Sequence, residues 1–335
     1  MSIVINGGGT VTGISAGGLP DDVITADDLA NSINSAIAAN TAKTGISSAQ
    51  TSAITANTAK TGITTAQAAA VNNMIANAFI SGGIETQYSE GGVMYRSHTF
   101  LNNSQILFTG SKAVDFLLVA GGGGGAGAEG YQGATGGAGA GGMVVGTSQT
   151  IAGGNYSIVV GAGGVGSDSV SAPGASGANS TFNSIVATGG GGGPDYDTDG
   201  IAGGNGSGGA EPGKPRGATN QNFYAGVSNL TGYGNIGGHG GNYVGGGSGS
   251  GGGAGGVGTN ANGGVSAGGV GRANSFRTGS NVTYGRGGNG GENAVTGTDE
   301  AVNTGNGAHA TVTKTGNNAA SGNGGSGIVV IRYAI

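Results

Sequence analysis

The run Val114-Asp115-Phe116-Leu117-Leu118-Val119-Ala120 leads directly into five glycines, Gly121-Gly122-Gly123-Gly124-Gly125. A short apolar run that is bounded by glycine is typical of a β-strand. The chain ends in a second such run, Ile328-Val329-Val330-Ile331-Arg332-Tyr333-Ala334-Ile335. Between the two, residues 189–325 are mostly Gly, Asn, Ser, Thr and Ala. We expect the two runs to pair in one sheet, which would attach both ends of the glycine-rich insertion to one β base.

Further strand-like segments lie before and inside the insertion. They cover residues 93–101, 105–108, 143–145, 156–160 and 180–187. Short β-branched and aromatic runs separated by Gly and Asn are typical of a β-sandwich or a jelly roll. We therefore predict a head domain over residues 84–335, with an all-β base and a glycine-rich insertion.

Composition excludes several classes of protein. Glycine accounts for 84 of 335 residues and proline for 5, whereas average glycine usage is about 7%. The glycines follow no Gly-X-Y period, so the chain is not a collagen. The absence of cysteine excludes a disulfide scaffold, a cysteine-based metal or redox site and a thiol enzyme.

Charge and hydropathy exclude further partners. The formal net charge is −5 and only 11 residues are Lys or Arg, so we expect no binding to nucleic acid. No stretch approaches the roughly 18 apolar residues of a membrane span, so we expect no membrane insertion. The first residues lack the basic and apolar regions of a signal peptide.

Two conformations are open to the glycine tracts. Gly-rich tracts are usually flexible linkers, and composition alone favours that interpretation. Alternatively, they form extended helices with three residues per turn, the polyglycine II conformation. Such helices can bond to one another, because no Cβ atoms keep them apart. The apolar strands that flank the insertion favour this packed alternative.

Residues 25–83 form a predicted α-helical stalk, of which residues 25–80 nearly lack glycine and contain an internal repeat. The segment 35–50 recurs as 52–67. In each copy a hydroxyl residue precedes a glutamine at the spacing of a capping box, as in Ser47 and Gln50. A glycine that suits a helix C-terminus comes just before each box.

These signals predict helices near residues 26–43, 48–60 and 65–79. Helices shorter than about 12–15 residues are marginal alone, so these need partners. A stalk made of several identical chains is our preferred interpretation, and a monomeric stack of three helices is the alternative. Residues 1–24 alternate short apolar runs with glycine, which is typical of an extended leader or of a frayed terminus.

Three motifs carry a resemblance to a known family. They are residues 114–125, 153–164 and 324–333, in this order. Together they resemble the glycine-rich domain of bacteriophage tail fibres and adhesins, over residues 95–335. The leader at 13–21 and the repeated Asn-Thr-Ala-Lys-Thr-Gly-Ile are similar to fibre proteins of marine phages and cyanophages.

The resemblance implies packed polyglycine II helices on a β base, a homotrimer and a role at the host surface. The expected protein is a non-enzymatic tail fibre, made in the host cytoplasm and attached by residues 1–24 to tail or baseplate proteins of the virion. Its receptor would be a surface saccharide or an outer-membrane protein. One alternative is a purely structural virion component of the baseplate, tail or capsid. Another is an extracellular glycine-rich host protein, which the missing signal peptide, membrane span and cysteines disfavour.

Catalytic signatures are weak. Gly-x-Gly-x-x-Gly occurs so often here that it does not indicate a dinucleotide site, and Gly213-Lys214 precedes Pro215 where a phosphate loop needs Ser or Thr. His98, His239 and His309 lack metal-ligand spacing. No set of nucleophile, base and orienting residue stands out, so we expect no catalytic residues and no organic cofactor.

One acidic cluster has the spacing of a calcium loop. Asp195, Asp197 and Asp199 alternate before Gly200, as in the first half of an EF-hand loop. Position twelve would be Gly206 instead of the usual glutamate, and no flanking helices are predicted. The sequence favours a solvated acidic turn, with a calcium site completed by backbone carbonyls as the alternative.

Aromatic residues within the glycine field are the candidates for receptor binding. Tyrosine offers a large contact area at low entropic cost, and Asn-rich loops offer adaptable hydrogen bonds. The interruption at 218–233 contains the densest group. Packing of these rings over glycine faces, as small cores, is the alternative. The candidates are Tyr131, Tyr196, Phe223, Tyr224, Tyr233, Tyr243, Phe276 and Tyr284.

Overall fold

The structure is a computed structural model with two compact units, Met1–Asn72 and Asn73–Ile335. In the described part of the chain, no helix has the length and apolar character that crossing a bilayer requires. The described residues are 4–5, 11–12, 31–41, 48–58, 80–128, 134–167, 172–242, 247–291, 297–311 and 320–335.

The first unit contains short elements only. The strands β1 (Val4–Ile5) and β2 (Val11–Thr12) pair antiparallel. The helices α1 (Asn31–Thr41) and α2 (Ser48–Thr58) have 11 residues each. They lie within the first two predicted ranges, and the third range, 65–79, falls outside the described residues. The residues that the structure describes show these two short helices and no long helical stalk.

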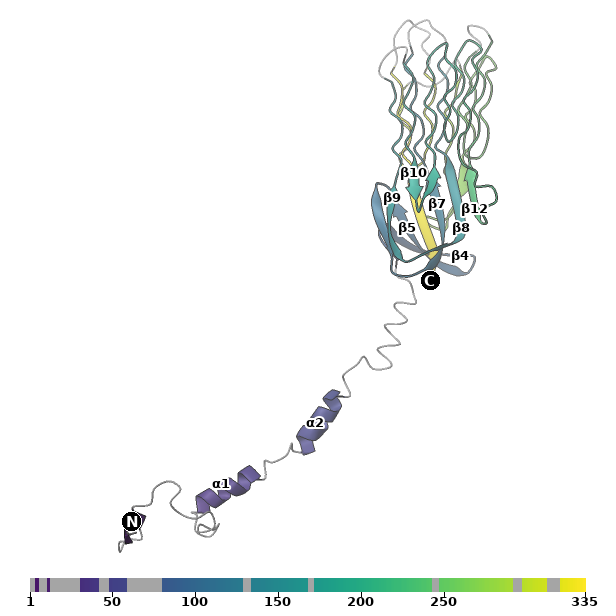
Figure 1. Cartoon of the computed structure of the whole chain (residues 1–335). Helices are drawn as coiled ribbons and strands as arrows, with labels where there is room; N and C mark the ends of the chain where they lie inside the picture. Colours follow the sequence, from purple (N-terminus) through teal and green to yellow (C-terminus); the bar gives the residue numbers. More distant parts are fainter. Residues whose placement is uncertain are drawn as a thin grey trace. The chain divides into compact units, whose positions relative to one another are not determined.

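The second unit is the head, an antiparallel β base from which the glycine-rich segments extend (Figure 1). A five-stranded sheet has the order β11-β10-β9-β6-β3, and a six-stranded sheet has the order β12-β8-β7-β15-β5-β4. A separate hairpin joins β13 and β14. The strands are β3 (Ile80–Ser81), β4 (Ile84–Glu90), β5 (Val93–Phe100), β6 (Ser104–Phe108), β7 (Lys112–Val119), β8 (Met143–Ile151), β9 (Gly154–Val159), β10 (Ser180–Phe182), β11 (Ile185–Ala187), β12 (Leu230–Tyr233), β13 (Arg272–Asn274), β14 (Val282–Tyr284) and β15 (Ile328–Ala334).

The two apolar runs that flank the insertion pair as expected. In the antiparallel pair of β7 and β15, Val119 lies opposite Ile328 and Asp115 lies opposite Arg332. The chain therefore enters and leaves the glycine-rich insertion at neighbouring strands of one sheet, and this prediction is confirmed.

Both faces of these two strands are buried. On one face, Phe116 and Leu118 of β7 pack in a cluster with Phe182 of the five-stranded sheet. On the other face, Leu117 and Val119 pack in a second cluster, which includes residues of the β13–β14 hairpin. Alternating residues of one strand thus contribute to two cores, which explains why residues 116–119 and 328–331 are all apolar.

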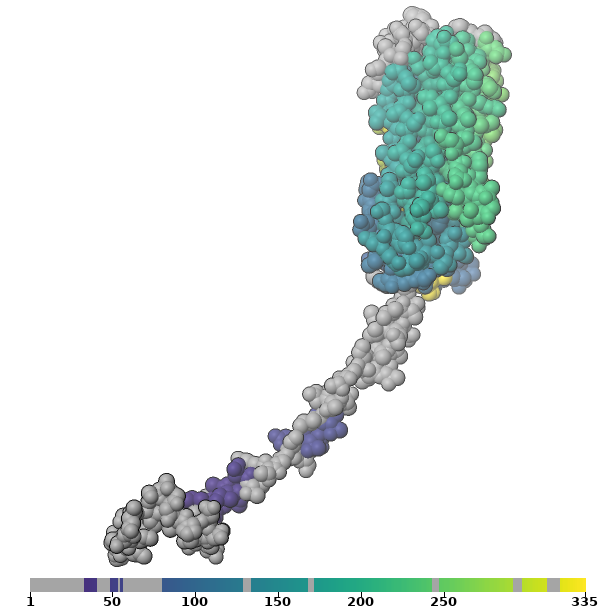
Figure 2. Space-filling model, viewed as in Figure 1, coloured from purple at the N-terminus to yellow at the C-terminus, as the bar shows by residue number. Residues whose placement is uncertain are grey.

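The glycine-rich segments run side by side away from the sheets (Figure 1), and the space-filling view shows base and segments as one continuous body (Figure 2). The amides of residues 121–125 bond to three neighbouring segments in turn, so that every third amide bonds the same neighbour. A repeat of three residues is that of polyproline II geometry. Their acceptors are, in order, the carbonyls of Ala178, Gly325, Gly139, Ala175 and Gly322, at 2.9–3.0 Å.

Residues 134–142 form the centre of this lattice. All of them are buried, and their backbone groups bond to other segments on every side. The packed alternative for the glycine tracts is confirmed by these hydrogen bonds, because the amides that a linker would leave to water bond here to neighbouring backbone. The neighbouring segments that bond residues 134–142 are 121–125, 188–194, 205–211, 249–252, 285–291 and 305–311.

Close approach explains why glycine is needed at the centre. A Cβ atom built on Gly139 would overlap the carbonyl oxygen of Asn205 and lie 2.8 Å from its carbonyl carbon. Gly264 provides a contrast at the margin, because its Cβ would have Asn262 Oδ1 as nearest neighbour, at 3.8 Å.

We expect Gly139→Ala to lower the free energy of unfolding by about 1–3 kcal/mol or more, because neighbouring backbones must separate to admit the methyl group. The matched variant Gly264→Ala should be neutral or slightly stabilising, since its φ is not left-handed and the space is open. Calorimetric unfolding of both full-length variants measures the difference. Equal stabilities would contradict the role assigned to close backbone approach.

His98 is a fully buried histidine in the base. Its Nδ1–H donates to the carbonyl of Gly82 at 2.6 Å, and the ring stacks on Tyr333. Among the described residues, Nε2 has no hydrogen-bond partner. Burial lowers the pKa of His98, and this effect outweighs the Gly82 hydrogen bond and the nearby carboxylate of Glu85. The folded head therefore holds His98 neutral.

Because the pKa of His98 is lower in the folded than in the unfolded chain, stability should be lost as pH falls below the ordinary histidine value of 6.5. We expect His98→Gln to flatten the dependence of the melting temperature on pH between about 7 and 5, whatever its effect on the absolute value. The exposed His239 provides the control variant, His239→Gln, which should keep the wild-type slope. A wild-type slope in His98→Gln would contradict this assignment.

Candidate binding surface

The structure divides the aromatic candidates into buried and exposed residues. Phe276 and Tyr284 are only 8% and 1% exposed, and they pack in the cluster that covers the outer face of the six-stranded sheet. They are core residues, so their assignment to receptor contact is corrected. Tyr131 and Tyr243 lie outside the described residues, and the structure says nothing of them.

The loop at residues 221–229 carries the most exposed aromatic candidate. It leads into β12, which is the edge strand of the six-stranded sheet, and it reaches β11, which is the edge strand of the five-stranded sheet. The loop therefore bridges the two sheets along one open side of the base. An open edge exposes unpaired backbone groups, which proteins commonly cover with a loop.

Tyr224 and Gln221 attach this loop to β11. The Tyr224 hydroxyl accepts from the amide of Val186 at 2.8 Å and donates to its carbonyl at 3.0 Å. The buried side chain of Gln221 accepts from the amide of Thr188 at 2.9 Å. Both side chains thus satisfy backbone groups at the sheet edge. Tyr224 is a positioning residue here, with its ring packed against the main core.

The other end of the loop is attached to β8. Gln149 donates to the carbonyls of Ser228 and Asn229 at 3.0 and 3.2 Å, and the amide of Thr147 donates to Asn229 at 2.9 Å. With both ends held, the backbone between them is preorganised. This arrangement lowers the entropy that a binding loop would otherwise lose in a complex.

The tethered loop presents apolar side chains to solvent. Phe223 is 51% exposed and Val227 is 50% exposed. Close to them in the chain, Tyr233 is half-buried beneath the guanidinium of Arg272, which lies 3.9 Å from the ring centroid. Sequence reasoning identified Phe223 and Tyr233 but missed Val227 and Gln221. An apolar or amide residue that interrupts a low-complexity tract is the signal that could have found them.

The acidic turn is not built as a metal site. Asp197 pairs with Lys214 at 2.8 Å, and Asp195 Oδ1 accepts from the amide of Tyr196 at 2.7 Å. Within the described ranges, no three His, Cys, Asp or Glu side chains come together to hold a metal ion. The structure places Asp195, Asp197 and Asp199 along a turn and does not gather them around one centre, while Tyr196 is half-buried beside them.

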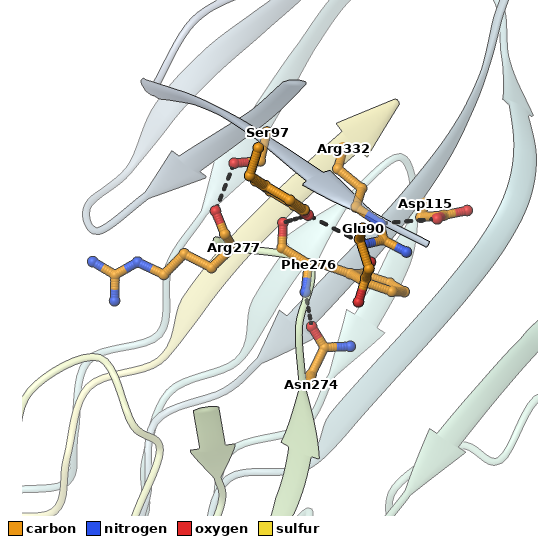
Figure 3. Close-up of polar contacts among 8 residues, drawn as sticks. Glu90, Ser97, Asp115, Asn274, Phe276, Arg277 and Arg332 are labelled. Carbon is orange, nitrogen blue, oxygen red and sulfur yellow. Dashed lines mark hydrogen bonds and ion pairs between the residues drawn. The ribbon is translucent and has the colours of Figure 1, made fainter. Parts of the chain in front are cut away.

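A second polar cluster surrounds Arg332 of β15 (Figure 3), beside Phe276 on the outer face of the six-stranded sheet. Arg332 is only 7% exposed, donates to Asp115 at 3.0 Å and pairs with Glu90. Its guanidinium also lies 4.0 Å from the ring centroid of Phe276. Burial opposes the charge, but hydrogen bonds to Tyr88 and Glu90 outweigh it and hold the pKa of Arg332 above its ordinary value.

This cluster fastens the loop between β13 and β14 to the sheet. The hydroxyl of Tyr88 donates to the carbonyl of Phe276 at 2.7 Å. The hydroxyl of Ser97 donates to the carbonyl of Arg277 at 2.8 Å (Figure 3). The amide of Phe276 donates to Asn274 at 2.9 Å. Because Arg332 pairs with both Glu90 and Asp115 within the fold, the cluster is structural.

A groove of about 400 Å³ lies where the base meets the lattice. Its lining combines three apolar side chains with two amides and one hydroxyl, and it contains no titratable group. The sequence carries no signal for it. The lining residues are Leu101, Asn102, Asn103, Val160, Gly161, Ala162 and Ser326.

Comparison with known families agrees with this architecture. A family model described as a glycine-rich domain matches residues 96–334. The matched region begins in β5 and ends in β15, so it includes both the strands that hold the insertion and the lattice itself. A search of curated proteins gives no match. The chain belongs to the glycine-rich domain family.

Proposed function

We propose that the chain is a non-enzymatic bacteriophage tail fibre protein that binds the host surface through loops of its head. The observation that carries this proposal is the loop at residues 221–229, which is held at both ends and exposes Phe223 and Val227. An exposed ring on a preorganised backbone is what recognition favours, because little freedom remains to be lost on binding.

The chemistry of this surface suits a saccharide or an outer-membrane protein. Phe223 offers a flat apolar face, and Asn222 and Arg272 are exposed polar residues in the neighbouring sequence and on the β13–β14 hairpin. The lattice adds rigidity, since its backbone groups bond between segments on all sides. A rigid head with a fixed, partly apolar loop therefore fits an adhesin.

The experiment measures adsorption of the labelled full-length chain to a host strain and its competition with phage infection. We expect Phe223→Ala to weaken adsorption by about tenfold or more, as loss of an aromatic anchor does. Val302→Ala is the matched control, because Val302 is 70% exposed elsewhere on the head. Equal adsorption of the two variants would contradict the assignment of the loop.

Failure of the wild-type chain both to adsorb and to compete would instead support the second candidate, a purely structural component of the virion. Such a component would use the same rigid lattice without a receptor. Calorimetric unfolding of each variant shows that a change in adsorption does not come from loss of the fold.

We further propose that the protein is a homotrimer attached to the virion through its N-terminal residues. The repeated helices α1 and α2 support association, because helices of 11 residues gain stability mainly from packing against partners. We expect mass photometry of the full-length chain to give the mass of three copies. A monomer at micromolar concentration would contradict the trimer.

A further inference from the structure

The described residues contain five Asn-Gly pairs. In such a pair the backbone nitrogen of the glycine can attack the side-chain carbonyl carbon of the asparagine. Glycine does not hinder this attack, because it has no side chain. The attack requires a free glycine amide and a mobile asparagine side chain. The pairs are Asn205-Gly206, Asn262-Gly263, Asn289-Gly290, Asn306-Gly307 and Asn323-Gly324.

In four of these pairs the lattice holds the glycine amide. Each amide donates to a carbonyl of a neighbouring segment, so it must first be released before it can act as a nucleophile. The bonds run from Gly206 to Asn235, from Gly290 to Ser266, from Gly307 to Arg286 and from Gly324 to Gly164, at 2.8–3.0 Å.

In the same four pairs the lattice also holds the asparagine side chain. Each Oδ1 accepts a backbone amide from another segment, which fixes the side chain in place. The donors are Asn235 to Asn205, Gly268 to Asn289, Arg286 to Asn306 and Gly166 to Asn323, at 2.8–2.9 Å. Both reacting groups are therefore restrained independently.

Among the described residues, Asn262 differs from the other four because no other segment holds its side chain or its glycine amide. Asn262 and Gly263 are exposed in a turn, and Gly263 has φ +79°. Within the described part of the chain, the amide of Gly263 makes no hydrogen bond. The amide of Gly264 donates to Asn262 Oδ1 at 3.3 Å. This contact is longer than those of the four lattice asparagines, and it joins two residues of the same turn instead of two segments.

We propose that Asn262 is a site of spontaneous deamidation, and that the hydrogen bonds of the lattice protect the other four asparagines. Hydroxide removes the amide proton of Gly263, whose nitrogen then bonds to the side-chain carbonyl carbon of Asn262. The bond from that carbon to the side-chain nitrogen breaks, and ammonia leaves with a proton from water. Water then opens the cyclic imide at either carbonyl, giving aspartate or isoaspartate. The product adds one negative charge to an exposed turn.

The test is incubation of the full-length protein in mildly alkaline buffer, followed by site-resolved peptide mass spectrometry. We expect Asn262 to convert about tenfold or more faster than each of the four lattice asparagines, since each must first break hydrogen bonds. Asn323 is the decisive internal control, because it is exposed like Asn262 but its Gly324 amide is bonded. Conversion of Asn323 as fast as Asn262 would overturn the proposal.

Two further measurements separate the lattice from local sequence. In denaturant-unfolded protein, the five sites should convert at similar rates. If Asn262 still converts faster than the other four sites by the same factor in the unfolded protein, local sequence explains the difference. The protective role of the lattice is then refuted. Asn262→Ser should remove the first acidic variant that appears on ion exchange. Persistence of that variant would place the reaction elsewhere. The proposal does not depend on host binding.

Discussion

The hydrogen bond from a backbone amide to the carbonyl of a neighbouring segment is the interaction on which the head depends. Each such bond contributes only about 0.5–1.5 kcal/mol net, but a buried amide left without a partner costs more. In the segment 121–125 the successive amides bond to three neighbouring segments in turn. This geometry requires backbones to approach so closely that a Cβ has no room, as at Gly139. The high glycine content and the packed architecture therefore both follow from the close backbone approach that these hydrogen bonds require.

The sequence predicted the parts of the fold that side chains specify. Runs such as Val114–Ala120 and Ile328–Ile335 indicate strands because their apolar side chains must be buried, and β7 and β15 pair accordingly. Which glycine segment lies beside which could not be predicted, because glycine carries no side-chain pattern. The capping signals placed two helices correctly, since α1 and α2 lie within the predicted ranges.

The candidate site was only partly predictable for a related reason. An aromatic residue among glycines looks the same in sequence whether it covers a sheet, as Tyr284 does, or faces solvent, as Phe223 does. The difference lies in long-range contacts, such as the packing of the Phe276 ring against the guanidinium of Arg332. Likewise, the calcium-like spacing of the acidic turn gave no indication that Lys214 would pair with Asp197.

The lattice also determines how the head should respond to temperature. Unfolding an ordinary domain exposes apolar side chains, which raises the heat capacity, whereas exposure of polar groups lowers it. Residues 134–142 consist of Gly, Ala and one Thr, so their unfolding exposes mainly peptide groups. The lattice therefore adds little to the heat-capacity change of the head. The free energy of unfolding of the head should therefore vary less with temperature than that of a domain of equal length with a conventional core. It should also decrease less on cooling.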